Sequence, residues 1–227
     1  MYKFDTTPAI RHGPARLTAR FVLASASPRR AEILRAAGFA FDVVPAGVDE
    51  NVAVGDQTPA GVAVQIAVSK ARAVAALFPD TVVLAADTVV AADSGLLAKP
   101  DSSAEAREML RMLRGQTHAV VTGVAVAYRG SVISDALQTL VTFRTYTDNE
   151  ADAYVATGAS LDKAGAYGIQ DRPFAPAASY DGCYLNVVGL PLCLTLRLLD
   201  RLSLLDRTVA QPPCPGHMPP LGRTVVR

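Results

Sequence analysis

The run S-A-S-P-R-R at positions 25–30 places two hydroxyls and two cations at the expected start of a helix. Ser27 suits the N-cap and Pro28 the first helical position, so that Arg29 and Arg30 fall in the first turn. Cations there oppose the helix dipole. A bound anion would resolve the conflict, because backbone N–H groups, hydroxyls and guanidinium groups would converge on one phosphate-sized region. The alternative is a capped helix with two solvated arginines.

A second chemical signal is an acid inside an apolar segment. Asp87 and Thr88 interrupt the run T-V-V-L-A-A-D-T-V-V-A-A at 81–92, which predicts a strand buried on both faces. An isolated buried carboxylate is costly, so it normally pairs with a cation, binds a metal or takes up a proton. The alternative is an aspartate that caps a loop at a strand end. The continuity of the run favours a chemical role for Asp87.

Three further charged residues stand at positions that suit directed contacts. Glu50 leaves the strand that follows the cationic turn, which makes it a candidate metal ligand, although a solvated acid is the plainer interpretation. Lys70 lies on the apolar face of a predicted helix, where a lysine usually extends its stem across apolar surface and its ammonium to solvent. Lys99 precedes Pro100, which favours extended backbone.

The segment L-D-K-A-G-A-Y-G-I-Q at 161–170 has the composition of a ligand-binding loop. Gly165 and Gly168 would let backbone approach a ligand, while Asp162, Lys163 and Gln170 supply charge and an amide. Glycine-rich loops are common, so this loop is a weak signal when taken alone.

One type of chemistry accounts for these features together. Triphosphate hydrolysis needs cations or N–H donors along the phosphates, and carboxylates that hold a divalent metal or take a proton from water. Rival sites lack their motifs: G-x-x-x-x-G-K-[ST], G-x-G-x-x-G after a strand, and G-x-S-x-G are all missing from the sequence. We therefore expect phosphoester chemistry.

Composition narrows the class of protein. The chain has 227 residues, is 50% hydrophobic and carries a formal net charge of +1, which predicts a soluble globular protein and argues against a nucleic-acid binder. No run has the length of a membrane span. Cys183, Cys193 and Cys214 lack metal-ligand spacing and are odd in number, so neither a zinc site nor a disulfide framework is indicated. A reducing, cytoplasmic location fits best.

The elements that must position the chemical residues alternate between strand and helix patterns. Strands are predicted at 21–24, 39–45, 81–92, 117–128, 132–146 and 184–188, and helices at 28–37, 58–78, 102–114, 147–158 and 191–205. This order predicts an α/β fold with a mixed sheet, in one domain at 21–205. Residues 1–20 are expected to form a flexible N-terminal extension, and residues 206–227 a Pro-rich mobile tail.

Seven short motifs in a fixed order resemble the Maf family. They are S-A-S-P-R-R-A-E-I-L at 25–34, V-D-E at 48–50, S-K-A at 69–71, A-D-T at 86–88, K-P at 99–100, D-K-A-G-A-Y-G-I-Q at 162–170 and N-V-V-G-L-P at 186–191. Several are weak alone, but their joint order and spacing are specific. The resemblance covers the chain from about Phe21 to Leu205.

The resemblance implies a two-lobed fold around a central cleft, related to inosine triphosphate pyrophosphatases. It also implies a hydrolase that acts on phosphoric anhydrides, cutting nucleoside triphosphates to a monophosphate and pyrophosphate with Mg²⁺ or Mn²⁺. The partner implied is this substrate. A homodimer is a further expectation, and neither nucleic acid nor a membrane is expected as a partner. Carried over by position, the roles are: Asp87 as proton acceptor; Arg29, Thr88 and Gln170 as selectors of the base; Ser27, Arg30, Lys70 and Lys99 as phosphate contacts; and Glu50 with Asp87 as metal ligands.

The three selecting positions are similar to those of the dTTP/UTP subgroup, and modified pyrimidine triphosphates are further substrates to consider. Two alternatives stay open: a nucleotide-binding regulator of cell division without turnover, and the methylated-GTP specificity of the same family, which Arg29 disfavours because that subgroup tends to have tryptophan there. The chain departs from the family pattern at Asp171, where glycine is usual, and along 172–181. These departures put the shape of the base pocket in question.

Overall fold

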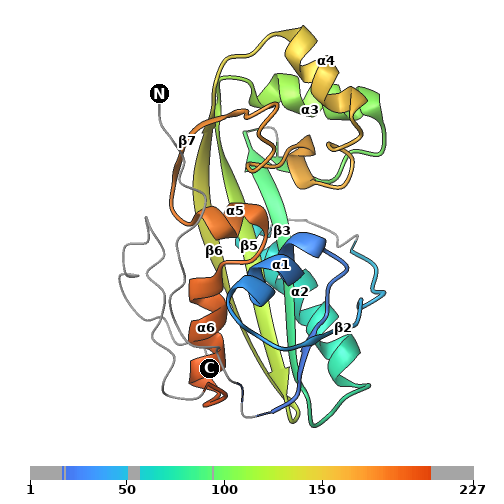
Figure 1. Cartoon of the computed structure of the whole chain (residues 1–227), viewed down its shortest axis with the longest axis vertical. Coiled ribbons are helices and arrows are strands. Elements are labelled where there is room, and N and C mark those ends of the chain that lie inside the picture. Colours follow the sequence, from blue (N-terminus) through green and yellow to red (C-terminus); the bar gives the residue numbers. More distant parts are fainter. Residues whose placement is uncertain (1–16, 18, 51–56, 94, 206–227) are drawn as a thin grey trace.

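The computed structural model describes residues 17, 19–50, 57–93 and 95–205, and its central feature is a seven-stranded mixed sheet (Figure 1). The strand order is β2-β1-β3-β5-β6-β7, with β4 also paired to β3. Strand β1 runs parallel to β2 and β3, whereas the other pairs are antiparallel. The strands are β1 Phe21–Leu23, β2 Asp42–Val43, β3 Val82–Ala92, β4 Gly95–Leu97, β5 Thr117–Tyr128, β6 Ser131–Phe143 and β7 Ala177–Asp181. The expected α/β mixed sheet is therefore confirmed.

The helices lie at two ends of the long strands, which gives the molecule two lobes (Figure 1). In the lower lobe of this view α1, α2 and α6 surround the sheet, whereas α3 and α4 cover its upper end. The helical elements are α1 Pro28–Ala36, α2 Pro59–Ala75, α3 Ser103–Leu113, α4 Asp148–Ala156, the 3-10 turn η1 Ala164–Ala166, α5 Tyr184–Val188 and α6 Leu192–Arg201. The long strands β3, β5 and β6 pass through both lobes, so one sheet connects the two lobes.

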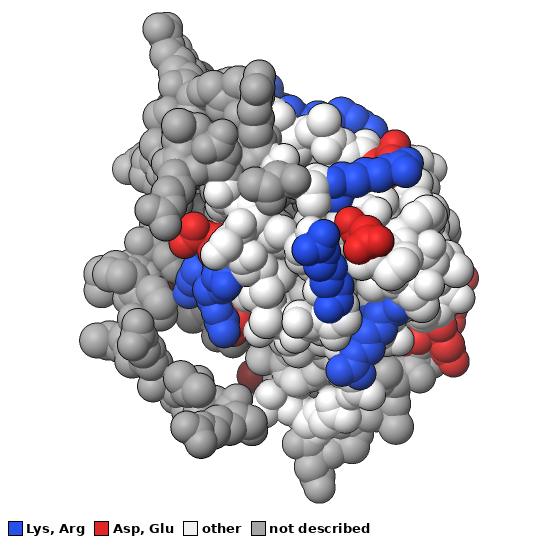
Figure 2. Space-filling model, turned by 90° about the horizontal axis from the view of Figure 1, so that it is seen from below, with Lys and Arg blue, Asp and Glu red and all other residues white. Residues whose placement is uncertain are grey.

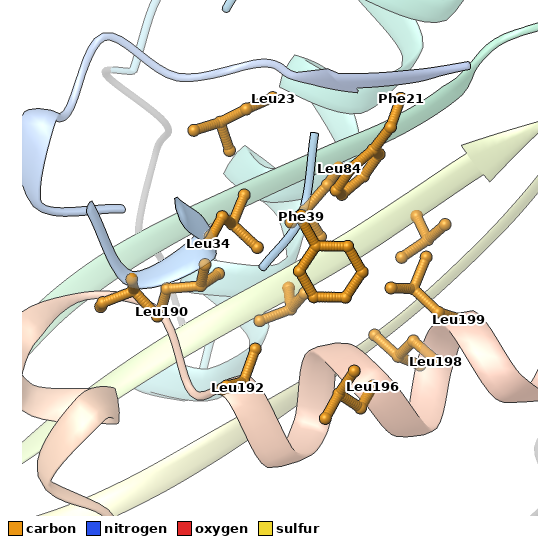
Figure 3. Packing of buried hydrophobic residues seen from close by; sticks show 14 of the residues in the cluster. Phe21, Leu23, Leu34, Phe39, Leu84, Leu190, Leu192, Leu196, Leu198 and Leu199 are labelled. Atoms are coloured by element: carbon orange, nitrogen blue, oxygen red, sulfur yellow. The ribbon is translucent and has the colours of Figure 1, made fainter. Parts of the chain in front are cut away.

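The lower lobe has a core on each face of the sheet, as the period of two along a strand requires. On one face, side chains from β1 and β3 pack against α1 and α6, and Figure 3 shows this cluster with Phe21, Leu23, Leu34, Leu84, Leu192, Leu196 and Leu199. On the other face Val22, Val83 and Ala85 pack against α2. Alternate residues of β3 therefore face α1 and α6, and those between them face α2.

An interruption along one edge of β3 creates the opening for a site. On this side β3 pairs with β1 at 82–84 and with β4 at 90–92. Asp87 and Thr88 lie between these two pairings. Because side chains alternate between the two faces of a strand, Asp87 points toward α2 and Thr88 toward the face that α1 covers. These two neighbouring residues therefore lie on opposite faces of the sheet.

Helix starts were the most accurate local predictions. Ser27 is the N-cap of α1, with Pro28 in the first turn, although the serine side chain makes no capping hydrogen bond. Thr147 and Glu150 form a capping box at the start of α4, where the sequence predicted a helix from residue 147. The strands predicted at 117–128 and 132–146 are present as the antiparallel pair β5 and β6. These features depend on neighbours in sequence, which explains why the sequence alone predicts them.

Other predictions of secondary structure were wrong. Residues 184–188 form the helix α5 and not a strand, because the side-chain amide of Asn186 donates to Val120 O and Thr139 Oγ1 and Gly189 ends the turn at φ 124°. The predicted strand at 39–45 shortens to β2. The helix predicted to reach Phe78 ends at Ala75, so Leu77 lies beyond its end and is 68% exposed.

The expected N-terminal extension and tail lie mostly outside the described residues. Leu17 forms an isolated antiparallel bridge with Leu205, and Leu17 and Ala19 pack against the lower core. Among the described residues, no helix is both long and apolar enough to cross a bilayer. On the face drawn in Figure 2, cationic and acidic side chains are interspersed among uncharged residues, and some of them lie next to one another.

Gly123 sets the distance between α2 and the sheet. It pairs with Asp87 in the β3–β5 ladder, and a Cβ at this position would lie 2.4 Å from the backbone carbonyl of Ala63 in α2. We expect Gly123→Ala to lower the free energy of unfolding by about 3 kcal/mol, because backbone cannot yield as a flexible side chain does. Thermal unfolding should show a melting temperature lower by roughly 10 °C.

Gly61→Ala is the matched control for this substitution. Gly61 is also in α2, but the nearest atom to a Cβ there would be the Thr58 hydroxyl at 3.4 Å. Because alanine favours the helix over glycine, we expect this variant to be as stable as the parent or slightly more so. Equal melting temperatures for the two variants would contradict the close approach at Gly123.

His118 makes the stability of the upper lobe depend on pH. It is buried beside Phe143, with Nε2 2.7 Å from the Tyr167 hydroxyl, and burial lowers its pKa to about 4. In the unfolded chain the pKa of a histidine is about 6.5. Between about pH 6.5 and pH 4 the unfolded state therefore binds more protons than the folded state, and the free energy of unfolding falls as the pH drops through this range. We expect a loss of about 2 kcal/mol at pH 5 relative to pH 7 from this group.

Urea unfolding at pH 7 and pH 5 tests this effect. In His118→Gln, whose amide can still bond to Tyr167, the difference between the two pH values should shrink by about that 2 kcal/mol. An unchanged difference would show that other groups cause the acid sensitivity.

Candidate active site

A cleft of about 960 Å³ lies between the two lobes and collects the predicted residues. Its walls include the β1–α1 turn and Glu50 on one side, and β4 with the loop after α4 on the other. The structure brings together all nine residues predicted from sequence, which are Ser27, Arg29, Arg30, Glu50, Lys70, Asp87, Thr88, Lys99 and Gln170. The geometry thus agrees with one site, while the individual roles stay predictions.

The cleft contains a buried lysine between two carboxylates. Lys70 Nζ lies 2.7 Å from Asp87 Oδ1 and 2.9 Å from Glu50 Oε1, and the lysine side chain is only 7% exposed. Lys70 lies at this point because Ala67, Ala71 and Val74, on the same side of α2, pack against Val83 and Ala85 of β3. The simple interpretation of Lys70 as a lysine that reaches solvent is therefore wrong.

The charges around Glu50 keep it ionised. Burial alone raises the pKa of this carboxyl, but the hydrogen bond and positive charge of Lys70, with smaller effects from Lys99 and Arg30, bring the pKa below its ordinary value. Lys99 Nζ is 3.6 Å from Glu50 Oε2 and its side chain is 60% exposed. Lys99 is thus an accessible cation at the rim, whereas Lys70 is enclosed.

Arg30 is buried and its guanidinium donates to three protein groups. Nε donates to Gly189 O at 2.8 Å, Nη1 to Ser25 Oγ at 3.0 Å and Nη2 to Thr88 Oγ1 at 3.2 Å. Burial lowers the pKa of this guanidinium, while Asp87 and Glu50 act in the opposite direction. The structure therefore shows Arg30 joining α1, β3 and α5, and its expected phosphate contact stays a prediction.

Arg29 reaches across the cleft to the upper lobe. Its Nη1 lies 2.8 Å from Asp162 Oδ2, and Lys163 Nζ lies 2.8 Å from the other oxygen of the same carboxylate. Partial burial raises the pKa of Asp162, but the hydrogen bonds from Lys163 and Arg29 outweigh it and leave the pKa below its ordinary value. Sequence reasoning noted Asp162 as a charged loop residue but did not predict its partner, because the two residues are far apart in the chain.

Asp171, which departs from the family pattern, has a defined place in the structure. Its carboxylate accepts a hydrogen bond from the Tyr154 hydroxyl and lies 3.6 Å from Lys163 Nζ. A Cβ at Gly168 would meet this carboxylate at 2.8 Å. Asp171 thus connects the glycine loop to α4 at the edge of the cleft.

Sequence reasoning missed a second set of residues behind Thr88. Thr122 contacts Thr88 directly, Asn186 connects to it through Thr122, and Gly189 connects to it through Arg30. The Ser25 hydroxyl, which was expected at the anion site, accepts instead from Arg30. Asn186 and Gly189 belong to one of the family-like motifs but carried no expected role. Thr122 had no signal at all, because a threonine in a strand pattern is unremarkable until its cross-strand neighbour is known.

The carboxylates fit a metal ion that arrives with a phosphate ligand. Within the described part of the chain, no group of three or more His, Cys, Asp or Glu side chains could hold a metal. Glu50 and Asp87 nevertheless place oxygens around one nitrogen. Mg²⁺ commonly binds through one or two carboxylates plus substrate phosphates and water, so this donor set is sufficient for such a metal.

Two lobes joined by one mixed sheet, with carboxylates and cations facing a shared cleft, define a protein built to bind a phosphate-bearing ligand. The family model described as Maf-like protein matches residues 20–202. The chain therefore belongs to the Maf family, as its motifs indicated.

Several similar proteins bear the name dTTP/UTP pyrophosphatase. The one from Moorella thermoacetica is 50% identical over 79% of this chain and 93% of its own length. Those from Dehalococcoides mccartyi strain CBDB1 and Thermomicrobium roseum are each 45% identical, over 80% and 85% of this chain and 82% and 90% of their own lengths. A solved nucleoside-triphosphatase / dITP/XTP pyrophosphatase from Mycobacterium abscessus is 20% identical with a TM-score of 0.38 and covers 55% of this chain and 74% of that one, which is too distant a likeness to support an argument.

Proposed function

We propose that this protein hydrolyses dTTP and UTP to the nucleoside monophosphate and pyrophosphate. The observation that carries the proposal is the enclosed Lys70, held 2.7 Å from Asp87 and 2.9 Å from Glu50 at the gap in the sheet edge, facing the cleft. Ion pairs that only stabilise a fold have no need to line a large cleft. The relatives named dTTP/UTP pyrophosphatase support the substrate class.

The proposed reaction adds water to the α-phosphorus and breaks the bridge to the β-phosphate. Asp87 takes a proton from the attacking water, and pyrophosphate leaves with the bridging oxygen. Lys70 contacts Asp87 Oδ1 and so orients the carboxylate, which presents its other oxygen to water. Lys99 and the N-terminal end of α1 with Ser27 neutralise the phosphate charge.

Glu50 and Asp87 would hold Mg²⁺ or Mn²⁺ together with phosphate oxygens. When bound, such a metal would polarise a phosphoryl oxygen and stabilise the charge that develops on it. Lys70 balances part of the negative charge of the two carboxylates before the metal and substrate arrive. We propose that the protein works in the cytoplasm, because its three cysteines indicate no disulfide framework.

The proposed selectors of the base stand on both sides of the cleft. Arg29 comes from the lower lobe, Gln170 from the upper lobe, and Thr88 from the strand between them. A glutamine amide offers both a donor and an acceptor to a pyrimidine edge. The ion pair between Arg29 and Asp162 fixes the arginine at the mouth of the cleft.

We expect Arg29→Trp to change which nucleotide is preferred. The substitution removes the pair with Asp162 and offers an indole face, which favours stacking on a cationic methylated purine. The ratio of kcat/KM for dTTP to that for 7-methyl-GTP should fall about tenfold or more. Arg35→Trp is the control, because Arg35 lies at the far end of α1; an unchanged substrate ratio in Arg29→Trp would remove Arg29 from the selecting set.

One assay tests the proposed function. Pyrophosphate release is measured with Mg²⁺ or Mn²⁺ across ordinary and modified nucleoside triphosphates, including dTTP, UTP, dCTP and 7-methyl-GTP. We expect dTTP and UTP to give the highest kcat/KM, with a monophosphate as the second product. Tight binding of dTTP without cleavage under either metal would instead indicate a nucleotide-binding regulator.

A further inference from the structure

A directed chain of hydrogen bonds runs from Arg30 through Thr88 into the interior. Arg30 Nη2 donates to Thr88 Oγ1 at 3.2 Å, Thr88 Oγ1 lies 2.9 Å from Thr122 Oγ1, and Thr122 Oγ1 donates to Asn186 O at 2.9 Å. Thr88 and Thr122 are direct partners in the β3–β5 ladder, on the face of the sheet that meets α5. The two hydroxyls are therefore close because of the register of the sheet.

The direction of each bond follows from the number of protons available. A guanidinium only donates and a backbone carbonyl only accepts, whereas each hydroxyl has one proton. If Thr122 donated to Thr88, its own oxygen would face the carbonyl of Asn186 with lone pairs on both sides and no proton between them. Thr122 therefore donates to Asn186 O, and Thr88 donates to Thr122.

The interior end of this chain of hydrogen bonds is buried away from water. Thr122 and Asn186 are both 0% exposed. Asn186 O also accepts from the backbone N–H of Gly189 at 3.1 Å, and the Asn186 side chain donates to Val120 O and Thr139 Oγ1. Water cannot substitute for the carbonyl at a fully buried position, so the Thr122 proton has a fixed target.

Thr88 consequently presents an acceptor to the cleft. Its hydroxyl uses its proton toward Thr122 and one lone pair toward Arg30, which leaves the second lone pair. The residue is partly exposed and lines the cleft. A hydroxyl in solution can rotate to donate or accept, but this one is restricted to accepting.

We infer that Thr122 is a positioning residue that makes Thr88 an obligatory acceptor and thereby selects pyrimidines that carry an N3–H. This inference rests on the proposed function. On the pairing edge of thymine and uracil, N3–H is the only donor, between two carbonyl oxygens. Cytosine has a bare nitrogen at N3, so its lone pair would face that of Thr88, with an unpaired polar group on each side.

Thr122→Val is the decisive variant, because valine has nearly the shape of threonine but neither accepts nor donates. Asn186 O keeps its bond from Gly189, so the interior loses no required donor. Thr88 regains a free proton and can turn it toward the bare N3 of cytosine. We expect the ratio of kcat/KM for dTTP to that for dCTP to fall about tenfold or more, mainly through better use of dCTP.

Two companion variants separate this effect from a general disturbance. Thr122→Ser keeps the hydroxyl and should keep the parent ratio within about twofold, whereas Thr122→Ala should lose selectivity as valine does. Melting temperatures confirm that each variant is folded. Equal ratios in the parent and in the folded valine and alanine variants would overturn the inference, as would an equal loss of selectivity in Thr122→Ser.

The same experiment distinguishes failure of this inference from failure of the proposed function. If the parent protein releases no pyrophosphate from dTTP, the proposed function fails and the inference fails with it. If the parent prefers dTTP over dCTP but the valine variant keeps that preference, the function stands and only the role of Thr122 is overturned.

Discussion

Asp87→Asn is expected to lower the kcat of pyrophosphate release from dTTP by about 10²- to 10⁴-fold, the range typical of a lost general base. Asparagine has almost the same shape as aspartate, and its carbonyl oxygen can accept the hydrogen bond that Lys70 donates to Asp87 Oδ1 at 2.7 Å. It cannot take a proton from water, and it is a poor ligand for a hard divalent metal. The loss should therefore appear in turnover while the fold persists.

Steady-state kinetics at saturating dTTP, with circular dichroism and thermal unfolding on the same samples, measure both properties. Asp101→Asn is the matched control, because Asp101 is an exposed carboxylate that also lines the cleft. We expect its kcat to change by less than about threefold, as for a charge screened by solvent. Near-normal turnover in a folded Asp87→Asn protein would refute the proposed role of Asp87.

The features that sequence alone predicts well are those encoded within a few residues. Ser27 and Pro28 specify the start of α1, and the apolar run around Asp87 specifies a buried strand with one acid in it. A buried acid must find a partner, so the sequence itself predicts that Asp87 is paired. The sequence does not single out Lys70 as this partner: its place on an apolar helix face predicts a lysine that reaches solvent, whereas the family resemblance implies a phosphate contact.

What the sequence does not reveal depends on register and on distant contacts. The 184–188 segment has residues that favour a strand, but the bonds of Asn186 to β5 and β6 override that preference. Asp162 meets Arg29 only because the lobes face each other across the cleft. Thr122 matters only because the ladder places it beside Thr88, and a shift of one residue would turn its side chain to the other face.

Lys70 is the position where stability and activity are expected to depend on the same contacts. Its ammonium is the shared partner of Asp87 and Glu50, so removal would leave the buried Asp87 carboxylate without its cation and facing the half-exposed carboxylate of Glu50. Breaking a buried pair by deleting one partner is far more costly than losing an exposed pair, because a charge remains buried without compensation. An exposed pair contributes roughly 0–1 kcal/mol.

We therefore expect Lys70→Met, which keeps the length of the side chain but removes its charge, to lower the free energy of unfolding by about 3 kcal/mol. The kcat for dTTP should fall by about 10²-fold or more, because the oriented carboxylate loses its hydrogen-bond donor. Urea unfolding and steady-state kinetics measure the two effects. Lys99→Met is the control for stability, since Lys99 is 60% exposed and contacts Glu50 only at 3.6 Å, and should change it by less than about 1 kcal/mol.

The double variant Lys70→Met/Asp87→Asn separates electrostatic repulsion from lost packing. If the destabilisation of Lys70→Met comes from two facing carboxylates, neutralising Asp87 should restore about 1 kcal/mol or more of it, even though activity stays low. If it comes from poor packing of methionine, the double variant should be no more stable than Lys70→Met alone. The first result would show that Lys70 offsets the mutual repulsion of Asp87 and Glu50.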